Sequence, residues 1–228
     1  MQRIFVWDIG LRLFHWLLVG CVVFSYISIE WRDEVIHHAY SGWAICTLLI
    51  FRFLWGVIVR PRYASFFHML RALGSLPGYM GNLARGAAPT WLGHNPLGAL
   101  SAFTMLLLLT LQILIGLCMS DDVFFEGPLY HLAPAWLTEM APAIHEQTFH
   151  LLLALVVLHL VAIVYYRVVK KQHLVAAMIT GRKQLAEDES VADNLGEENY
   201  SQGFTLRACV VLILTFVASW YLLAVWIP

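Results

Sequence analysis

The sequence predicts an all-α membrane protein, built as a four-helix transmembrane bundle with a fifth transmembrane helix added after it. Hydrophobic residues make up 60% of the 228 positions and charged residues only 13%, a balance that excludes an ordinary soluble domain. Five apolar runs are long enough to cross a hydrocarbon core of about 30 Å as helices. They span residues 11–29, 39–59, 97–119, 147–168 and 204–227. The net charge of −1, without a basic block, excludes nucleic acid as a partner.

The charged residues between the runs predict how the chain is oriented. Lysine and arginine gather before the first run and after the second and fourth runs: Arg3, Arg12, Arg60, Arg62, Arg71, Arg85, Arg167, Lys170, Lys171, Arg182 and Lys183. The other two loops hold a single basic residue, Arg32, among several carboxylates. By the positive-inside rule, the N-terminus is cytoplasmic and the C-terminus lies on the opposite side. We therefore expect a multi-pass protein with membrane lipid around it.

The first run, which opens with WDIGLRLFHW, carries a histidine near its cytoplasmic end. His15 lies about one turn inside the membrane surface, and Arg12 precedes it by three residues on the same helix face. His15 is either a metal ligand or an interfacial histidine among aromatic anchors. Because only residues 30–36 separate the first run from the second, these two helices should be antiparallel neighbours.

The second run combines adjacent histidines at its start with an arginine near its end. His37 and His38 point about 100° apart, so only one of them faces a given cofactor. We favour His38, because Gly42 lies one turn away and lets a flat ring approach the backbone. Arg52 shares the face of His38, and an arginine at that depth needs an anion or a water-filled cavity. A haem propionate suits it, whereas snorkelling to the headgroups is the alternative.

Residues 60–95 read as a loop with one short amphipathic helix, PRYASFFHMLRALGSL, on the membrane surface. At the end of this loop, Asn95 is predicted to cap the third run and Pro96 to be its first helical residue. His94 is a candidate ligand-binding residue at the cytoplasmic face, although capping chemistry explains most of this motif. The third run holds no histidine or charge and is assigned to packing. The acidic, aromatic loop 120–143 is either a docking surface or an ordinary solvated loop.

The fourth run contains two histidines, His145 and His159, in an otherwise apolar stretch. Fourteen helical residues bring the second to within about 40° of the first and about 21 Å further along the axis. One helix face therefore offers an imidazole near each side of the membrane. An imidazole in lipid needs a partner, and a metal or a haem iron is a natural one. A hydrogen bond to a neighbouring helix is the alternative for either histidine.

The chain becomes polar and acidic after the fourth run, with QLAEDESVADNLGEEN in this part. Such a composition is typical of a flexible linker. The predicted division is therefore a core at residues 1–170, a cytoplasmic linker at 171–203 and an additional transmembrane helix at 204–228.

The predicted topology pairs the four histidines by depth. His38 and His145 lie near the non-cytoplasmic side, and His15 and His159 lie near the cytoplasmic side. Two axial imidazoles on one iron are typical of low-spin electron transfer and leave no open position for a substrate.

Several motifs in order along the chain resemble the bacterial cytochrome b561 family: VWDIGLRLFHW, HAYSGWAICTLLIFRFLWG, TWLGHNPLG, the histidine pair of the fourth run and LVAAMITGRK. The resemblance covers residues 4–183 and is nearest to the membrane cytochrome b subunits of nickel–iron hydrogenases and their relatives. It implies that His15, His38, His145 and His159 ligate two b haems in a four-helix core. The fifth run and the short loop between the third and fourth runs depart from that pattern.

The resemblance also implies a function in the bacterial inner membrane, with a periplasmic C-terminus. Such proteins pass electrons between the quinone pool and a periplasmic redox partner, such as a c-type cytochrome or a hydrogenase. We expect an electron-transfer subunit without catalytic residues of its own, rather than a stand-alone enzyme. At the cytoplasmic end, Arg12, Arg52, His94 and Asn95 are candidate contacts of a quinone.

Other functions compete with this interpretation. A haem oxidoreductase, such as a superoxide oxidase or a ferric reductase, keeps the haems but changes the reaction. A non-redox membrane anchor leaves the four depth-matched histidines unexplained. An intramembrane zinc protease is excluded, because the spacing in HEQTFH turns His150 about 140° away from His145.

Overall fold

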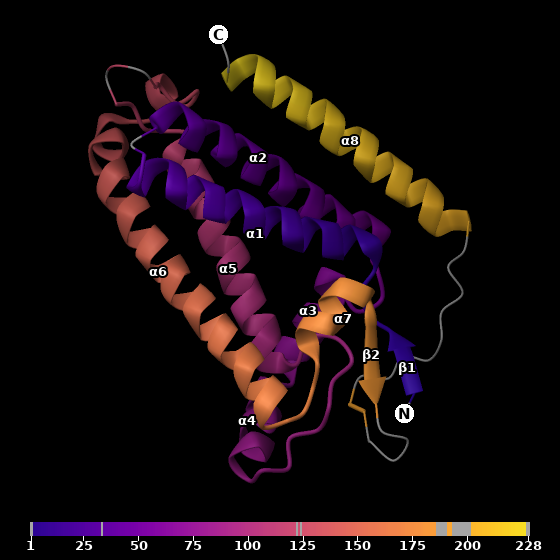
Figure 1. Ribbon diagram of the computed structural model, residues 1–228. Coiled ribbons are helices and arrows are strands. Elements are labelled where there is room, and N and C mark those ends of the chain that lie inside the picture. The colour runs from indigo at the N-terminus through magenta and orange to yellow at the C-terminus, as the bar shows by residue number, and fades with distance from the viewer. Residues whose placement is uncertain are drawn as a thin grey trace. The chain divides into compact units, whose positions relative to one another are not determined.

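The computed structural model describes residues 2–32, 34–121, 123, 125–185, 191–192 and 202–226. In this part of the chain, four helices are long and apolar enough to cross a membrane (Figure 1). They are α1 (Ile9–Glu30), α2 (Val35–Leu54), which continues as the π-helix η1 (Trp55–Val59), α5 (Pro96–Gly116) and α6 (Ala135–Val168). The prediction of a helical protein with four long apolar helices is confirmed.

Shorter elements join or follow these helices. The helical ones are α3 (Phe66–Gly74), α4 (Leu76–Ala84), the 3₁₀ turn η2 (Tyr130–Leu132), α7 (Leu174–Thr180) and α8 (Gln202–Trp226). Two short strands, β1 (Gln2–Phe5) and β2 (Arg182–Leu185), form an antiparallel pair that the sequence did not predict. The loop 60–95, for which one amphipathic helix was predicted, holds the two helices α3 and α4.

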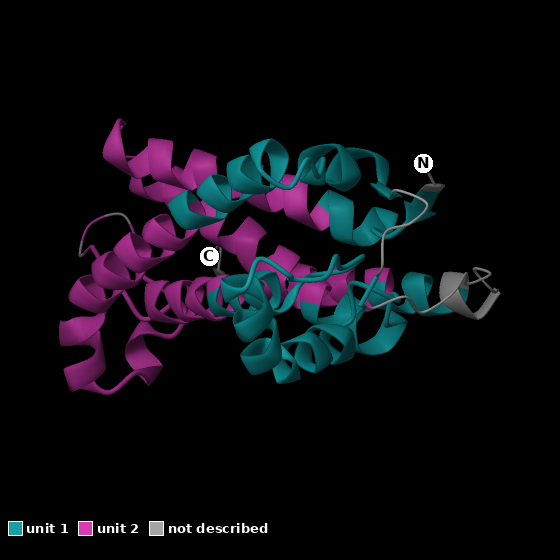
Figure 2. Cartoon of the chain, turned by 90° about the horizontal axis from the view of Figure 1, so that it is seen from below, with its two compact units in different colours: residues 1–13, 53–104, 157–211 teal, residues 14–52, 105–156, 212–228 magenta. Residues whose placement is uncertain are grey.

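The chain folds as two compact units (Figure 2). Unit 1 consists of residues 1–13, 53–104 and 157–211, and unit 2 consists of residues 14–52, 105–156 and 212–228. The residues of the predicted core, 1–170, are therefore divided between two units, each with contributions from α1, α5 and α6.

In unit 1, a buried carboxylate fixes the start of α1. Asp8 is 2% exposed, and its Oδ1 atom accepts the backbone N–H of Leu11 at 3.0 Å, which caps the helix. The same Oδ1 atom accepts the indole N–H of Trp55 at 2.8 Å. A Cβ atom at Gly10 would overlap the Trp55 ring, so glycine permits this close approach. Asp8 thus joins the first turn of α1 to η1.

The β1–β2 pair ties the N-terminal residues of unit 1 to the segment after α6. Gln2 pairs with Leu185 and Phe5 with Arg182. The strand pair is extended by Gly181, whose carbonyl accepts the backbone N–H groups of Val6 and Trp7 at 2.8 and 3.1 Å. Gly181 has a φ of +80°, which glycine adopts without strain.

The predicted linker at 171–203 is therefore shorter than expected. Residues up to Leu185 form α7 and β2 within unit 1, and both Ala177 and Leu185 are buried there. Composition misled the prediction, because the polar residues of β2 gain their backbone partners only from β1. Residues 186–190 and 193–201 of the predicted linker lie outside the described part of the chain.

Helix α6 begins at Ala135, well before the predicted start at residue 147, and it is 34 residues long. Two prolines misled the prediction. Pro134 precedes the first helical residue, and Pro142 lies inside the helix. An interior proline removes one backbone hydrogen bond and usually ends a helix, but here Ala141 is fully buried and the helix continues.

Helix α8 contacts the rest of the protein along one narrow face. Among the described side chains of α8, the buried ones are Val211, Thr215 and Ser219, each one turn apart. In unit 2, Ser219 Oγ donates to Thr47 Oγ1 of α2 at 2.7 Å. The side chains described here form a shorter apolar helix, Leu206–Leu222. A fifth transmembrane helix at 204–227 stays a prediction, and residue 227 lies outside the described chain.

We predict that Asp8→Ala destabilises the protein, because it removes the cap of α1 and the acceptor of the buried Trp55 indole N–H. The cap contributes about 1 kcal/mol, and a buried donor that loses this partner costs about 1–3 kcal/mol. The measurement is thermal unfolding in detergent, followed by circular dichroism. Asp8→Asn is the matched control, because its amide oxygen still accepts both bonds. Equal losses for the two variants would contradict the double role of Oδ1.

Candidate functional site

Two histidines from different helices face each other in unit 2. The ring centroids of His38, on α2, and His145, on α6, are 6.1 Å apart, and the rings are inclined by 73°. Two imidazoles on opposite sides of one metal ion, with bonds of about 2 Å each, have centroids roughly 6 Å apart. The observed separation therefore suits two axial ligands of one metal.

The orientation of the His38 ring is set by Ser25 of α1. Nδ1 of His38 lies 3.1 Å from the Ser25 carbonyl oxygen and 3.1 Å from its hydroxyl oxygen. Because a carbonyl only accepts, the ring donates from Nδ1, and Nε2 keeps its lone pair. Ser28 Oγ donates to the same carbonyl at 2.8 Å. Hydrogen bonds of this kind to the second ring nitrogen fix the orientation of a metal-binding histidine.

His145 is positioned by α5. A Cβ atom at Gly116 would lie 3.3 Å from Cε1 of His145, so the imidazole rests against the backbone of that glycine. One turn earlier on α5, Gln112 accepts a hydrogen bond from Thr148 of α6. Nδ1 of His145 is buried, and the ring lies within hydrogen-bonding reach of the backbone of Gln112. A buried imidazole of this kind fits a ligand of a bound group.

Three other histidines have partners away from this pair or lie elsewhere on α6. His37 Nδ1 is 2.8 Å from Glu34 Oε2, and His131 Nε2 is 2.8 Å from Glu126 Oε1. The His150 ring lies beside the Phe149 ring, with centroids 5.8 Å apart. His37 therefore contacts Glu34, whereas its neighbour His38 contacts Ser25.

Beside His38, Gly42 leaves open space on α2. A Cβ atom built at Gly42 meets only Ile113 Cδ1, at 4.0 Å, among the described residues. Arg52, near the end of α2 in the same unit, is only 2% exposed. A buried guanidinium favours a site that supplies oxygen acceptors.

The second predicted pair is not brought together in one unit. His15 lies in unit 2, where its ring meets Trp16 edge-on at 5.0 Å between centroids. His159 lies on α6 in unit 1. Ligation by His15 and His159 stays a prediction from the sequence.

The predicted quinone contacts in unit 1 have structural partners. Asn95 Oδ1 accepts the backbone N–H of Gly98 at 2.8 Å, which confirms it as the cap of α5. Its Nδ2 donates to the hydroxyl of Tyr166 at 2.5 Å. Arg12 Nη1 donates to the carbonyl of Ile179 at 2.5 Å. Asn95 and Arg12 therefore position helices, a role that their sequence motifs indicated only for Asn95.

His94 lies beside the first residues of the chain, and two tyrosines lie near Asn95. The His94 ring packs against the Trp7 ring at 4.9 Å between centroids. Tyr166 and Tyr79 share a hydrogen bond of 3.1 Å between their hydroxyls. Burial, and then this bond, raise the pKa of Tyr79, so its phenol stays protonated at neutral pH. Sequence reasoning missed this tyrosine pair, because its members are 87 residues apart.

The ligand set itself restricts the kind of metal group. Within the described chain there is no group of three or more His, Cys, Asp or Glu side chains that could hold a metal ion. A zinc site needs three or four protein ligands, whereas His38 and His145 supply only two. Two imidazoles suit a metal whose remaining ligands come from a macrocycle, as in haem.

Comparison with known proteins agrees with this conclusion. The family model of prokaryotic cytochrome b561 matches residues 6–181. The match covers α1 to α7 and ends before α8. No curated protein and no solved structure matches the chain.

We predict that Gly42→Leu lowers haem retention, because the larger side chain fills the space beside His38. Overpacking of a bound ring corresponds to roughly 5- to 100-fold weaker binding. Haem per chain is measured from the absorption of the reduced pyridine complex. Gly42→Ala is the control and should retain haem, since its Cβ has room. Equal haem contents for the leucine variant and the unmodified protein would show that no ring lies there.

Proposed function

We propose that this chain, which belongs to the prokaryotic cytochrome b561 family, relays electrons between membrane quinone and a periplasmic redox partner. Membership of the family indicates a membrane electron-transfer protein that binds haem b. The observation that carries the finer proposal is the His38–His145 pair, at 6.1 Å between ring centroids. The partner class that we propose is a c-type cytochrome or a hydrogenase.

Haem b, when bound, supplies one-electron transfer. The residues of unit 2 would hold this group: His38 and His145 would each supply one ring nitrogen to the iron. Ser25 holds the His38 tautomer that leaves Nε2 available. A haem held by both of these imidazoles would have no iron position open to a small substrate. This favours a relay over the superoxide oxidase or ferric reductase alternative, and a non-redox anchor has no use for the pair.

A second haem, held by His15 and His159, completes the proposed relay. Arg52 supports a propionate contact, because its guanidinium is buried and carboxylates are its preferred partners. The orientation is proposed from the basic residues, with the N-terminus in the cytoplasm and the protein in the bacterial inner membrane. The periplasmic partner then meets the loop 120–143.

Quinone exchange is proposed at the cytoplasmic end, near His94. Asn95 and Arg12 are bound to Tyr166 and Ile179 and act as positioning residues. His94 is the remaining predicted contact in unit 1, and an imidazole exchanges protons near neutral pH. A quinone needs such a group, because its reduction takes up protons together with electrons.

The test of the ligand pair is single substitution followed by haem counting. His38→Ala and His145→Ala should each remove the haem that this pair holds and leave the other haem in place. His37→Ala and His131→Ala are the controls, because both side chains are bound to glutamates. Haem per chain and the low-spin resonance signals are measured on the purified protein. Retention of full haem content in both ligand variants would refute the assignment.

The test of the quinone site uses an N-oxide quinone analogue. It should shift the absorption spectrum or midpoint potential of one haem, and His94→Ala should weaken its binding by roughly 5- to 30-fold, the range for one lost polar contact. Haem content should stay unchanged. Because His94 packs on Trp7, His94→Phe keeps the ring contact and separates lost packing from lost proton exchange. Normal analogue binding in both variants would place the site elsewhere.

A further inference from the structure

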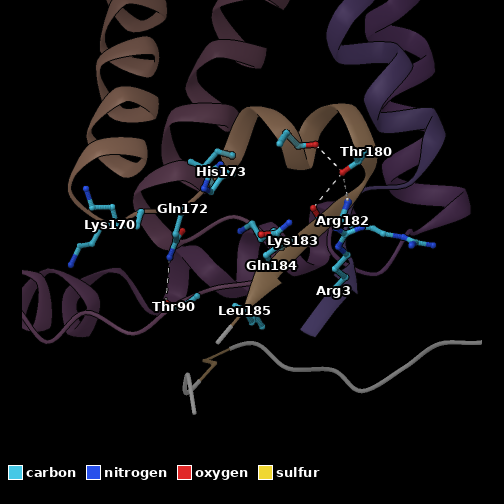
Figure 3. Close-up of a pocket in the computed structure, with 13 residues that line it drawn as sticks. Arg3, Thr90, Lys170, Gln172, His173, Thr180, Arg182, Lys183, Gln184 and Leu185 are labelled. Carbon is cyan, nitrogen blue, oxygen red and sulfur yellow. Dashed lines mark hydrogen bonds between the residues drawn. The ribbon is translucent and has the colours of Figure 1, made fainter. Parts of the chain in front are cut away.

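A basic cavity of about 600 Å³ lies in unit 1, outside the histidine pair (Figure 3). Five cationic side chains line it, and no carboxylate is found among its lining residues in the described chain. The cations are Arg3, Lys170, Lys171, Arg182 and Lys183. Such a concentration of one charge sign attracts an anion.

Three segments of the fold build this cavity. The end of α6 leads directly into Lys170 and Lys171, and β2 supplies Arg182 and Lys183. Arg3 comes from β1, where it pairs with Gln184. The strand pairing therefore brings Arg3, which precedes the matched region, and Arg182 and Lys183, which follow it, into one charged wall.

Hydrogen bonds hold the wall in place. Lys183 Nζ donates to the carbonyl of Trp91 at 2.9 Å. Gln172 Nε2 donates to Thr90 Oγ1 at 3.4 Å. These bonds connect the residues after α6 to the segment before α5, so the cavity is a built feature of unit 1.

An apolar groove of about 420 Å³ adjoins the basic cavity. The two share His173, Leu174 and Ala176 as lining residues. The rest of the groove is formed mainly by Ile163, Val164, Val175 and Ile179 of α6 and α7. Val164 is 60% exposed and Ile179 is 59% exposed. Because α6 is one of the membrane-spanning candidates, its exposed Val164 is expected to face lipid, and Ile179 of α7 lies in the same groove.

A guanidinium stands where the two cavities meet. Arg167 Nη1 lies 2.6 Å from Nε2 of His173, and both residues line the groove. Arg167 is the last basic residue of α6, so the boundary between charged and apolar walls falls at the end of this helix. A charged cavity that continues into an apolar groove at a helix end is complementary to a phospholipid, which has a charged headgroup and an apolar acyl chain.

We infer that the two cavities form one site for an anionic phospholipid. Its phosphate lies among Lys170, Lys171 and Arg182, and an acyl chain lies along Val164 and Ile179. Basic pockets next to transmembrane helices recognise anionic headgroups in this way. A free phosphate is a poorer fit, because it leaves the apolar groove empty. A zwitterionic lipid is also a poorer fit, because its choline or amine is repelled by the five cationic side chains.

A run of acidic residues follows the cavity lining in the sequence. Leu185 is the last lining residue along the chain, and the N–H of Ala192 donates to the carbonyl of Thr90, another lining residue, at 2.9 Å. Between them stand the acidic residues Glu187, Asp188 and Glu189, which lie outside the described residues. The test must therefore separate a bound lipid from these carboxylates.

Lipid binding is measured on the full-length protein by native mass spectrometry. Phosphatidylglycerol, phosphatidylcholine and inorganic phosphate are each added to delipidated protein. The double variant Lys170→Gln, Lys171→Asn should bind phosphatidylglycerol roughly 30-fold more weakly, since each interfacial cation contributes about fivefold. Asparagine is chosen at position 171 because the backbone there has a φ of 55°. The matched control is Arg71→Gln, Arg85→Gln, which removes two exposed arginines of unit 1 that do not line the cavity.

A groove variant and a charge variant complete the experiment. Val175→Ser should weaken phosphatidylglycerol binding several-fold without changing the thermal unfolding midpoint. Inorganic phosphate should not displace the lipid from the unmodified protein. Full displacement by phosphate would overturn the inference in favour of a free-anion site. The charge variant combines three substitutions, Glu187→Gln, Asp188→Asn and Glu189→Gln. The inference also fails if this variant binds phosphatidylglycerol and the unmodified protein does not, because the chain's own carboxylates then fill the cavity.

Discussion

A polar group inside an apolar helix must find its partner within the protein, and the structure depends on how this need is met. Ser25 meets it for His38 between α1 and α2, and Gln112 meets it for Thr148 between α5 and α6. Asp8 does the same for Trp55 between α1 and η1. Dispersion alone sets no register between apolar helices. These few bonds set it, and the two imidazoles face each other as a result.

Local properties of the sequence were enough to predict the four long helices. Length and hydropathy are read within one segment, and so is a cap such as Asn95, which bonds to Gly98 only three residues away. The prediction errors arose where residues far apart in the sequence determine the local structure. Pro142 lies inside α6 beside Ala141, which packing buries completely, and β2 exists because β1, almost the whole chain away, completes its hydrogen bonds. Neither cause is visible in a sequence window.

Helical periodicity also placed His38 and His145 on candidate faces before their rings were seen 6.1 Å apart. Periodicity did not find Ser25, because a hydroxyl in an apolar helix usually bonds its own backbone, as Thr104 and Thr110 do here. It also did not show that Arg12 bonds to Ile179 or that Asn95 bonds to Tyr166. Sequence patterns identify which residues carry suitable chemistry, whereas packing decides which of them remain available to a ligand.

The short β1–β2 ladder has a consequence for how the chain threads a bilayer. Paired strands must lie in the same aqueous compartment, so the chain between Phe5 and Arg182 crosses the membrane an even number of times. Four apolar helices lie in that interval, and their number satisfies this parity. Three or five crossings would put the strands in opposite compartments and break every hydrogen bond of the ladder. The eight residues of the two strands thus require an even number of membrane crossings between them. This requirement is independent of hydropathy and of the distribution of basic residues.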